Sequence, residues 1–325
     1  MSTVPFTPPP VCETERFRVE MTVSCRDCDG LDRVAEAGRV IEESGERIQI
    51  MHNGVRVIEG GYYGAWMTEI IERLGGHHEP QEERVFHELL KHVRPDATMI
   101  ELGGFWSYYS LWFLSEGQDR RSVVLEPDPR NIAVGRRNAE LNGRTIDFVQ
   151  AYAGPVTREA VTHTTDTVRR LTLPQHTVAE LMGRFGFPAL DILHCDIQGG
   201  ETALIESCED MLRAGTIRFG VFSTHAHQIS GDPLTHQKCL HLIREFGGSV
   251  LAEHDVHEGF SGDGLIVAYF GKEPLDWPAL EISHNRYATS LYRNPLYDLA
   301  EERAAGALGH IIKRARGIAR RLVRG

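Results

Sequence analysis

The sequence predicts an α/β protein whose main domain is a mostly parallel, seven-stranded sheet with an antiparallel last pair. From residue 98 to residue 270, short apolar stretches alternate with segments of helical period, as expected of consecutive βαβ units. The last two apolar stretches are joined by about eleven residues without a helical pattern, which favours an antiparallel pair. Hydrophobic residues make up 41% and charged residues 25% of the 325 residues, so the composition is that of a globular chain.

The charge balance is acidic overall but uneven. The chain has 35 Lys and Arg against 46 Asp and Glu, a net charge of −11, which argues against nucleic-acid binding through a broadly basic surface. Residues 313–325 hold six basic residues and no acidic one, leaving 29 basic against 46 acidic residues elsewhere. We find neither a long apolar run nor the pattern of a signal peptide, and therefore expect a cytoplasmic protein.

The cysteines do not resemble a secreted disulfide framework. The six are few for this length and mostly isolated: Cys12, Cys25, Cys28, Cys195, Cys208 and Cys239. Only Cys25 and Cys28 have the spacing of a metal or redox pair. Because a closed zinc site needs four ligands and neither Cys12 nor His52 adds a second paired spacing, the pattern favours two thiols in an N-terminal turn.

The first 78 residues predict a lead-in and a small cap. Residues 1–16, with four prolines among the first ten, are expected to be disordered. Residues 17–78 should form an α+β cap that includes strands at 47–51 and 55–59, because Asn53-Gly54 between apolar runs predicts a hairpin. A helix is expected to begin at Pro80 and to end before Pro95.

The main domain is predicted at residues 79–271. Its expected strands are 98–102, 122–126, 145–150, 191–196, 218–223, 249–253 and 265–270. Its expected helices lie near 107–115, 129–141, 177–185, 200–212 and 233–246. No internal repeat appears along the chain.

A C-terminal extension follows at residues 272–325 and ends in a basic amphipathic helix. Two interpretations of this helix stay open. It could dock on an acidic face of its own chain or of a neighbouring subunit in a homo-oligomer, or it could make a peripheral contact with anionic lipid. Docking or simple solvation is favoured, because Gly317 weakens the helix and its apolar face is short.

Candidate ligand-binding residues follow the first three strands. In an open α/β sheet, ligands bind outside the carboxyl ends of the strands. After the first strand, Glu101 is followed by Gly103 and Gly104, which allow a tight turn and a close approach of backbone to ligand. The second strand ends in Glu126-Pro127, where a carboxylate can accept both hydroxyls of a ribose. Ala151 and Tyr152 follow the third strand at the same edge of the sheet.

Candidate catalytic residues follow the fourth and fifth strands. Asp196 ends the fourth strand, and His225 and His227 follow the fifth as H-x-H. This set suits general-base catalysis, with His254 in a secondary position, and the same set could hold a divalent metal. The base interpretation is favoured over the metal one. The loop 260–264, with two glycines, is a candidate lid.

These motifs resemble those of the FkbM-type methyltransferase family over residues 79–270. The resemblance rests on three elements: Glu101, Gly103, Gly104 and Ser110; then Leu125-Glu126-Pro127 with Asn131, Asn138 and Asn142; then His194, Asp196, Gln198, Gly199 and Glu201. Phe105, Ser107, His194 and Gln198 stand where the family has Asn, Gly, Lys and Glu. Because Ser107 replaces a glycine, we expect less room near the methionine half of the cofactor.

The resemblance implies a Rossmann-like class I methyltransferase sheet and an S-adenosylmethionine-dependent O-methyltransferase. It implies a sugar, a glycan or another small hydroxylated metabolite as acceptor. In that interpretation Glu101, Gly103 and Gly104 hold the methionine and ribose part, Glu126 and Pro127 the ribose, Ala151 and Tyr152 the adenine, while Asp196 lies between cofactor and acceptor. Two alternatives stay open: a Mg²⁺- or Mn²⁺-dependent enzyme with Asp196, His225 and His227 as ligands, and a catalytically silent nucleoside-binding module.

Overall fold

The computed structural model describes residues 15–165, 170–286, 288–292, 303 and 306. Most of the predicted lead-in and the whole basic helix at 313–325 lie outside the described residues. Residues 15 and 16, which we expected to be disordered, belong to the helix α1 (Glu15–Val23).

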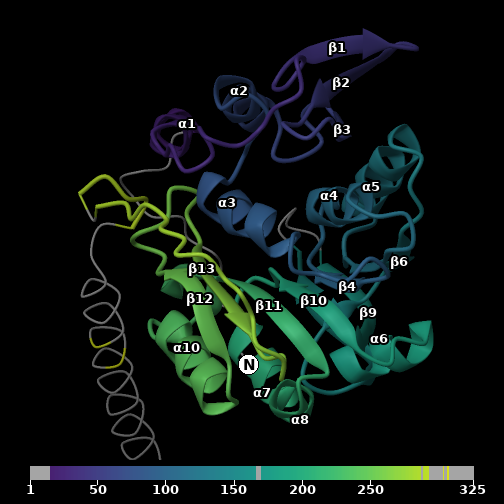
Figure 1. Ribbon diagram of the computed structural model, residues 1–325, viewed down its shortest axis with the longest axis vertical. Coiled ribbons are helices and arrows are strands. Elements are labelled where there is room, and N and C mark those ends of the chain that lie inside the picture. The colour runs from purple at the N-terminus through teal and green to yellow at the C-terminus, as the bar shows by residue number, and fades with distance from the viewer. Residues whose placement is uncertain (1–14, 166–169, 287, 293–302, 304–305, 307–325) are drawn as a thin grey trace, which may run out of the picture.

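The main sheet has the predicted seven strands, in the spatial order β12-β13-β11-β10-β4-β5-β6 (Figure 1). The strands are β4 (Thr98–Leu102), β5 (Arg121–Leu125), β6 (Asp147–Val149), β10 (Leu190–Cys195), β11 (Ile217–Thr224), β12 (Ser249–His254) and β13 (Gly264–Tyr269). The five strands β6, β5, β4, β10 and β11 are parallel, and β13 pairs antiparallel with both β11 and β12. The predicted fold class and its antiparallel last pair are therefore confirmed.

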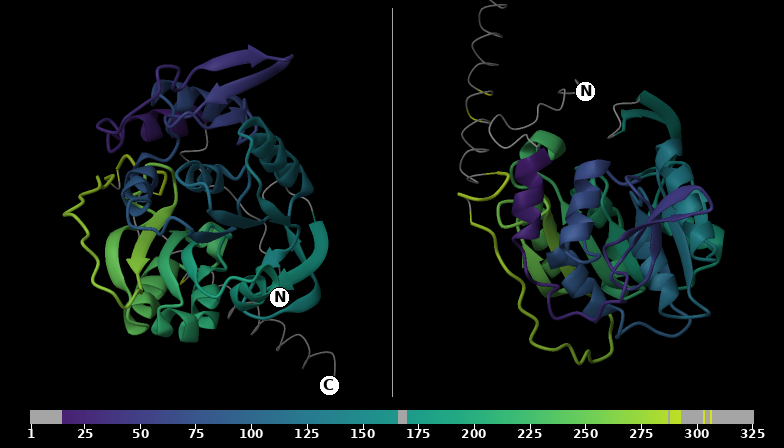
Figure 2. Two further views of the ribbon diagram at one scale, coloured as in Figure 1. Left: turned by 45° about the vertical axis from the view of Figure 1, so that its right-hand side comes forward. Right: turned by 90° about the horizontal axis from the view of Figure 1, so that it is seen from above.

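Helices cover both faces of this sheet, as the two further views show (Figure 2). They are α3 (Pro80–Leu89), α4 (Tyr108–Ser115), α5 (Pro129–Leu141), α6 (Val178–Phe185), α7 (Glu201–Ser207), α8 (Glu209–Ala214), α9 (His227–Ser230) and α10 (Thr235–Glu245). One apolar core lies between the sheet and α3 and α4, and a second lies between the sheet and α6, α7 and α10. The single helix predicted at 200–212 is two helices that meet at Cys208.

The cap contains more regular structure than its sequence predicted. Beside α1 it has β1 (Val40–Glu43), β2 (Glu46–Ile50), β3 (Arg56–Ile58) and α2 (Ala65–Arg73). The predicted hairpin is present as β2 and β3, which pair antiparallel. Two asparagine side chains hold the cap in place, one on α5 and one at its C-cap. Asn138 Oδ1 accepts from Ile58 N at 2.8 Å, and Asn142 Oδ1 accepts from Arg56 N at 2.9 Å.

A second sheet after β6 was not predicted. It consists of β7 (Tyr152–Ala153), β8 (Arg158–Thr164) and β9 (Arg170–His176) in the order β7-β9-β8. Six of the seven residues of β8 are exposed. Because neither face of β8 is buried, its sequence lacks the apolar alternation by which a strand is recognised.

Among the helices of the described residues, none combines the length and the apolar character that crossing a membrane requires.

Candidate functional site

A cavity of about 240 Å³ opens at the carboxyl ends of β4, β5 and β10. The chain reverses direction across the sheet between β4 and β10, so this edge is the topological switch point at which α/β sheets bind ligands. Its lining comes from the strand tips, the cap and β8: Tyr62, Tyr63, His78, Glu79, Glu82, Glu101, Gly103, Gly104, Phe105, Trp106, Tyr109, Leu125, Glu126, Pro127, Tyr152, Ala153, His163, Thr164, Thr165, His194, Asp196, Ile197 and Gln198.

Gly103 allows the tips of β4 and β10 to meet beneath the cavity. Its φ of +78° lies in the left-handed region, and a Cβ at this position would lie 1.7 Å from the carbonyl oxygen of Asp196. The backbone of Asp196 in turn donates to the Leu102 carbonyl at 2.9 Å. No residue with a side chain fits here without moving the backbone, so the glycine read from the sequence is a steric requirement.

Two later residues in this loop have a left-handed backbone although they are not glycine. Phe105 has φ +39° and Ser107 has φ +64°. Ser107 does not line the cavity. Its Oγ lies against α5, 2.6 Å from the position that a Cβ on Gly135 would take. The expected loss of room through Ser107 is therefore not seen, because the side chain points toward α5.

Glu126 stands at the tip of β5 and is held by three donors. Its carboxylate accepts from Phe105 N at 3.1 Å, from Asp128 N at 2.8 Å and from Asn131 Nδ2 at 3.2 Å. The residue is 5% exposed and lines the cavity. These bonds fix the orientation of the carboxylate at the edge of the cavity.

The other predicted cofactor residues divide into lining and buried positions. Glu101 lines the cavity, accepts from Ser110 N at 3.1 Å and from Ser110 Oγ, and has its pKa raised by burial. Pro127 and Tyr152 also line the cavity. Ala151 is fully buried and does not line it, whereas the following Ala153 does.

An aromatic wall from the cap covers the loop after β4. The Tyr62 ring stacks on Trp106 at 4.7 Å and meets Phe105 edge-on at 5.0 Å, and Tyr63 lies 5.2 Å from Phe105. The sequence predicts Tyr62 and Tyr63 within the cap at residues 17–78 and indicates no role for them in the site. Their role in lining the cavity is seen only from their position over the tip of β4.

Ionised side chains from α3 and β10 form another side of the cavity. Burial lowers the pKa of His78, but the carboxylates of Glu79 and Glu83 outweigh this and raise it to about 10, so the imidazole is cationic at neutral pH. His194 Nε2 lies 2.7 Å from Glu82 Oε1, and this carboxylate raises the pKa of His194 against the effect of burial. The spacing of residues 78–82 matches no motif, so the sequence did not predict His78 and Glu82, whereas His194 belongs to the third motif of the resemblance.

His225 is surrounded by carboxylates. Its Nε2 lies 3.0 Å from Asp196 Oδ1 and 3.7 Å from Asp263 Oδ1, and its Nδ1 lies 2.9 Å from Glu201 Oε1. Burial lowers the pKa of His225, but Glu201, Asp263 and Asp196 together raise it well above 6.5. An imidazolium has no lone pair with which to accept a proton, so this environment suits an anchor for Asp196 better than a general base.

None of the three predicted histidines, His225, His227 and His254, lines this cavity. His227 begins α9 and lines neither this cavity nor a smaller one beside it. His254 lines the smaller cavity together with Asp263 of the candidate lid loop, and burial lowers its pKa to about 4. Among the described residues, no set of three ligand atoms close enough for a metal includes Asp196, His225 or His227.

The charge of the cavity is distinctive. Five carboxylate side chains line it, and none of its described lining residues is Lys or Arg. The His78 imidazolium offsets part of this charge, and burial raises the pKa of Glu82 and Glu101. Acidic side chains still outnumber cationic ones in the lining, which favours a cationic ligand over a pyrophosphate or a nucleic-acid backbone.

No protein-family model matches the sequence, and no curated protein is significantly similar to it. Solved structures of similar architecture include the precorrin-6y C5,15-methyltransferase of Geobacter metallireducens, at 13% identity, with 58% of this chain and 86% of that chain covered and a TM-score of 0.38. They include TrmK of M. capricolum in complex with S-adenosylhomocysteine, at 12% identity, with 70% of this chain and 86% of that chain covered and a TM-score of 0.37. They also include the ribosomal protein L11 methylase of Lactobacillus delbrueckii, at 12% identity, with 60% of this chain and 81% of that chain covered and a TM-score of 0.36.

Proposed function

We propose that this protein is an S-adenosylmethionine-dependent O-methyltransferase. The observation that carries the proposal is the strand order: five adjacent parallel strands are followed by β13, which runs antiparallel between β11 and the edge strand β12. A cavity lies at the switch point, and Glu126 is at the tip of β5, the second strand of the main sheet in chain order. A six-stranded parallel dehydrogenase sheet has no such antiparallel strand, and the loop after β4 lacks the third glycine of a dinucleotide fingerprint.

The charge of the cavity supports the same ligand. S-adenosylmethionine carries a sulfonium cation, whereas a nicotinamide dinucleotide carries an anionic pyrophosphate. Five carboxylates and the absence of Lys and Arg among the described lining residues favour the first over the second.

We assign the cofactor residues by position. Gly103 and Gly104 present backbone to the methionine part, Glu126 accepts from the ribose hydroxyls, and Tyr152 offers a ring face to the adenine. Glu101, whose pKa is raised, lies below the glycine loop and fixes it through Ser110 on α4.

Methyl transfer to oxygen is an in-line displacement. The acceptor oxygen forms a bond to the methyl carbon, the carbon–sulfur bond breaks to release S-adenosylhomocysteine, and the hydroxyl proton must leave the oxygen. We assign the proton to Asp196, whose side chain is 30% exposed and lies within 3.0 Å of the His225 ring. His225 is the positioning residue that orients this carboxylate.

The acceptor class rests on the resemblance to the FkbM-type family. It implies a sugar, a glycan or another small hydroxylated metabolite. The aromatic wall of Tyr62, Tyr63 and Phe105 would suit the apolar face of a sugar ring, because such faces pack on aromatic side chains.

Calorimetry with S-adenosylhomocysteine tests the proposal directly. The wild-type protein is expected to bind it, and Glu126→Gln is expected to weaken binding by about tenfold or more through loss of a charged hydrogen-bond acceptor. Glu206→Gln, which removes an exposed carboxylate on α7, is the control and should bind like wild type. A folded wild-type protein that does not bind at millimolar concentration would exclude the proposal.

Two further measurements separate the remaining alternatives. Loss of activity on chelation of Mg²⁺ and Mn²⁺ would favour the metal-dependent form of the reaction. Cofactor binding without methylated product from any member of a panel of sugars and small alcohols would favour the silent module.

A further inference from the structure

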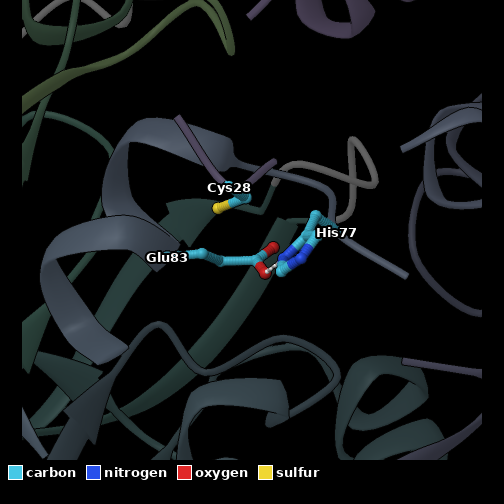
Figure 3. Close-up of side chains that lie close together, drawn as sticks. All are labelled: Cys28, His77 and Glu83. Carbon is cyan, nitrogen blue, oxygen red and sulfur yellow. Dashed lines mark hydrogen bonds and ion pairs between the residues drawn. The ribbon is translucent and has the colours of Figure 1, made fainter. Parts of the chain in front are cut away.

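Outside the cavity, the structure brings together a buried group of metal-binding side chains. Cys28, His77 and Glu83 each offer one ligand atom, and these atoms all lie within 4.8 Å of one another. The three residues are 3%, 0% and 0% exposed. Figure 3 shows the three side chains close together, with the Glu83 carboxylate facing the His77 ring.

A fourth donor lies beside them. The His52 ring stacks on the His77 ring with centroids 4.1 Å apart, and His52 Nε2 lies 3.9 Å from Glu83 Oε2. His52 is 2% exposed. His52 therefore adjoins the three-residue set through His77 and Glu83, although it is not part of the set whose ligand atoms all lie within 4.8 Å of one another.

The hydrogen bonding of this group is incomplete. Neither nitrogen of His52 has a hydrogen-bond partner, and neither does Nε2 of His77. Buried polar atoms are almost always paired, so three unpaired imidazole nitrogens at one place require an explanation. A coordinated cation would supply a partner for one nitrogen of each ring.

We propose that Cys28, His77, Glu83 and His52 bind one Zn²⁺ ion. Thiolate, imidazole and carboxylate are the ligands that zinc takes in proteins, and four protein ligands in a closed site are typical of a structural zinc. None of the four residues lines either cavity, so the ion is placed in the interior and away from the proposed chemistry.

The positions of the ligands define the role of the ion. Cys28 follows α1, His52 lies in the turn between β2 and β3, His77 precedes α3, and Glu83 is on α3. One ion therefore fastens three parts of the cap to the helix that packs on the main sheet. It also fixes the backbone beside His78 and Glu79, which line the cavity.

Cobalt substitution of the full-length protein tests the site. Metal-stripped protein titrated with Co²⁺ alone should bind about one equivalent and develop a thiolate-to-cobalt charge-transfer band together with the visible bands of a tetrahedral ion. Cys28→Ser should lose the charge-transfer band, and His77→Gln should bind Co²⁺ at least tenfold more weakly.

Two cysteine variants serve as matched controls. Cys25→Ser removes the other buried thiol of the pair, and Cys208→Ser removes a buried thiol in the opposite core. Both should keep the band. Loss of the band in Cys25→Ser as well as in Cys28→Ser would contradict the ligand set.

A measurement on the wild-type protein covers the case in which Cys28→Ser does not fold. X-ray absorption of the zinc-loaded protein should show one sulfur ligand at about 2.3 Å and the remaining ligands as nitrogen or oxygen. Folded wild-type protein that binds no stoichiometric Zn²⁺ or Co²⁺ would overturn the proposal. None of these readouts involves the cofactor, so they are independent of the methyltransferase proposal.

Discussion

Single residues at this site are constrained mainly by backbone contacts. Gly103 is fixed by the Asp196 carbonyl, Phe105 and Ser107 keep left-handed backbone angles, and Glu126 is bound by three donors of its own chain. Three of the five non-glycine residues with positive φ among the described residues lie in the loops after β4 and β10. Such conformations are costly and are found where a binding site requires them.

Replacement of Gly103 separates steric contact from backbone angle. Gly103→Ala is expected to lower the free energy of unfolding by about 3 kcal/mol or more, because the new Cβ adds overlap with the Asp196 carbonyl to the left-handed strain. Gly143→Ala is the matched control, since Gly143 has φ +59° and nothing within 4 Å of its Cβ position. It should cost about 1 kcal/mol. Urea unfolding measures both, and equal losses would contradict the steric explanation.

Asp263 should make stability depend on pH near neutrality. Burial raises its pKa from 3.8 to about 7; His225 opposes this, while Asp196 and Glu79 add to it. Because the pKa of Asp263 is higher in the folded state than in the unfolded state, the protonated side chain contributes to the free energy of unfolding below pH 4. This contribution is lost as the pH rises through 7. Because a third of the side chain is exposed, we expect only about 1 kcal/mol after screening.

The measurement for Asp263 is urea unfolding at pH 5 and pH 8. Asp263→Asn should reduce the loss of stability that the wild type suffers between these two values. The same loss in both proteins would show that another group is responsible.

At the scale of elements, the strands and helices that contribute apolar faces to the two cores were predictable from the sequence. The strands of the sheet β7-β9-β8, which contribute little to either core, were not. β4 and α5 have the predicted bounds, and the other main-sheet strands lie within two residues of theirs at each end. The strand β8 escaped prediction because its exposed residues carry no apolar period. The strand β9 has only a short alternation, at Leu171 and Leu173, before Pro174. They matter for the site, since His163, Thr164 and Thr165 reach the cavity from this sheet.

A buried carboxylate joins three elements at the opposite, amino-terminal edge of the main sheet. Asp191 on β10 accepts from Arg94 Nη2 at 2.7 Å, from Arg218 Nη1 on β11 at 2.8 Å and from Thr98 N on β4 at 3.1 Å. Burial raises the pKa of Asp191, but the hydrogen bonds from Arg94 and Arg218 outweigh it and hold the pKa below 3.8.

Asp191→Asn should therefore destabilise the fold by about 2–3 kcal/mol at neutral pH, because it removes the charge that both arginines face. Because the pKa of Asp191 is lower in the folded state than in the unfolded state, the ionised carboxylate stabilises the fold above pH 4. This stabilisation is lost as the pH falls through the pKa of the folded state. The variant should differ from wild type less at pH 3 than at pH 7 in thermal unfolding. Asp147→Asn, at the exposed start of β6, is the control and should match wild type at both values.

At the scale of the whole molecule, the cap and the main domain act as one site. The sequence predicts a domain boundary near residue 79. Residues on both sides of this boundary line the cavity: Tyr62 and His78 precede it, and Glu79 follows it. The proposed zinc ion would lie across the same boundary. Removal of the cap is therefore expected to destroy the cavity, although the main sheet has its own strands and helices.

The basic segment at 313–325 lies outside the described residues, so its role stays a prediction. We favour docking or solvation over lipid contact. Full-length protein and a version ending at Ile312 should then pellet equally with anionic liposomes. Greater pelleting of the full-length protein would support the lipid interpretation and a membrane-associated acceptor.

The sequence alone determined the architecture of the main sheet and the residues at its strand tips. Apolar periodicity and a short last connection were sufficient for the strand types, because burial acts on every residue of such elements. It also located Gly103, Glu126 and Asp196, since strand ends of a parallel sheet share one edge.

Only the tertiary structure decided how these groups combine. It placed His225 among three carboxylates, left His227 outside the cavity, and brought Tyr62 and His78 of the cap to the edge of the sheet where the cavity lies. It also joined Cys28 to His52, His77 and Glu83, which are separated by up to 55 positions in the chain. Spacing cannot predict such groups, because their members come from segments that meet only when the cap folds against the sheet.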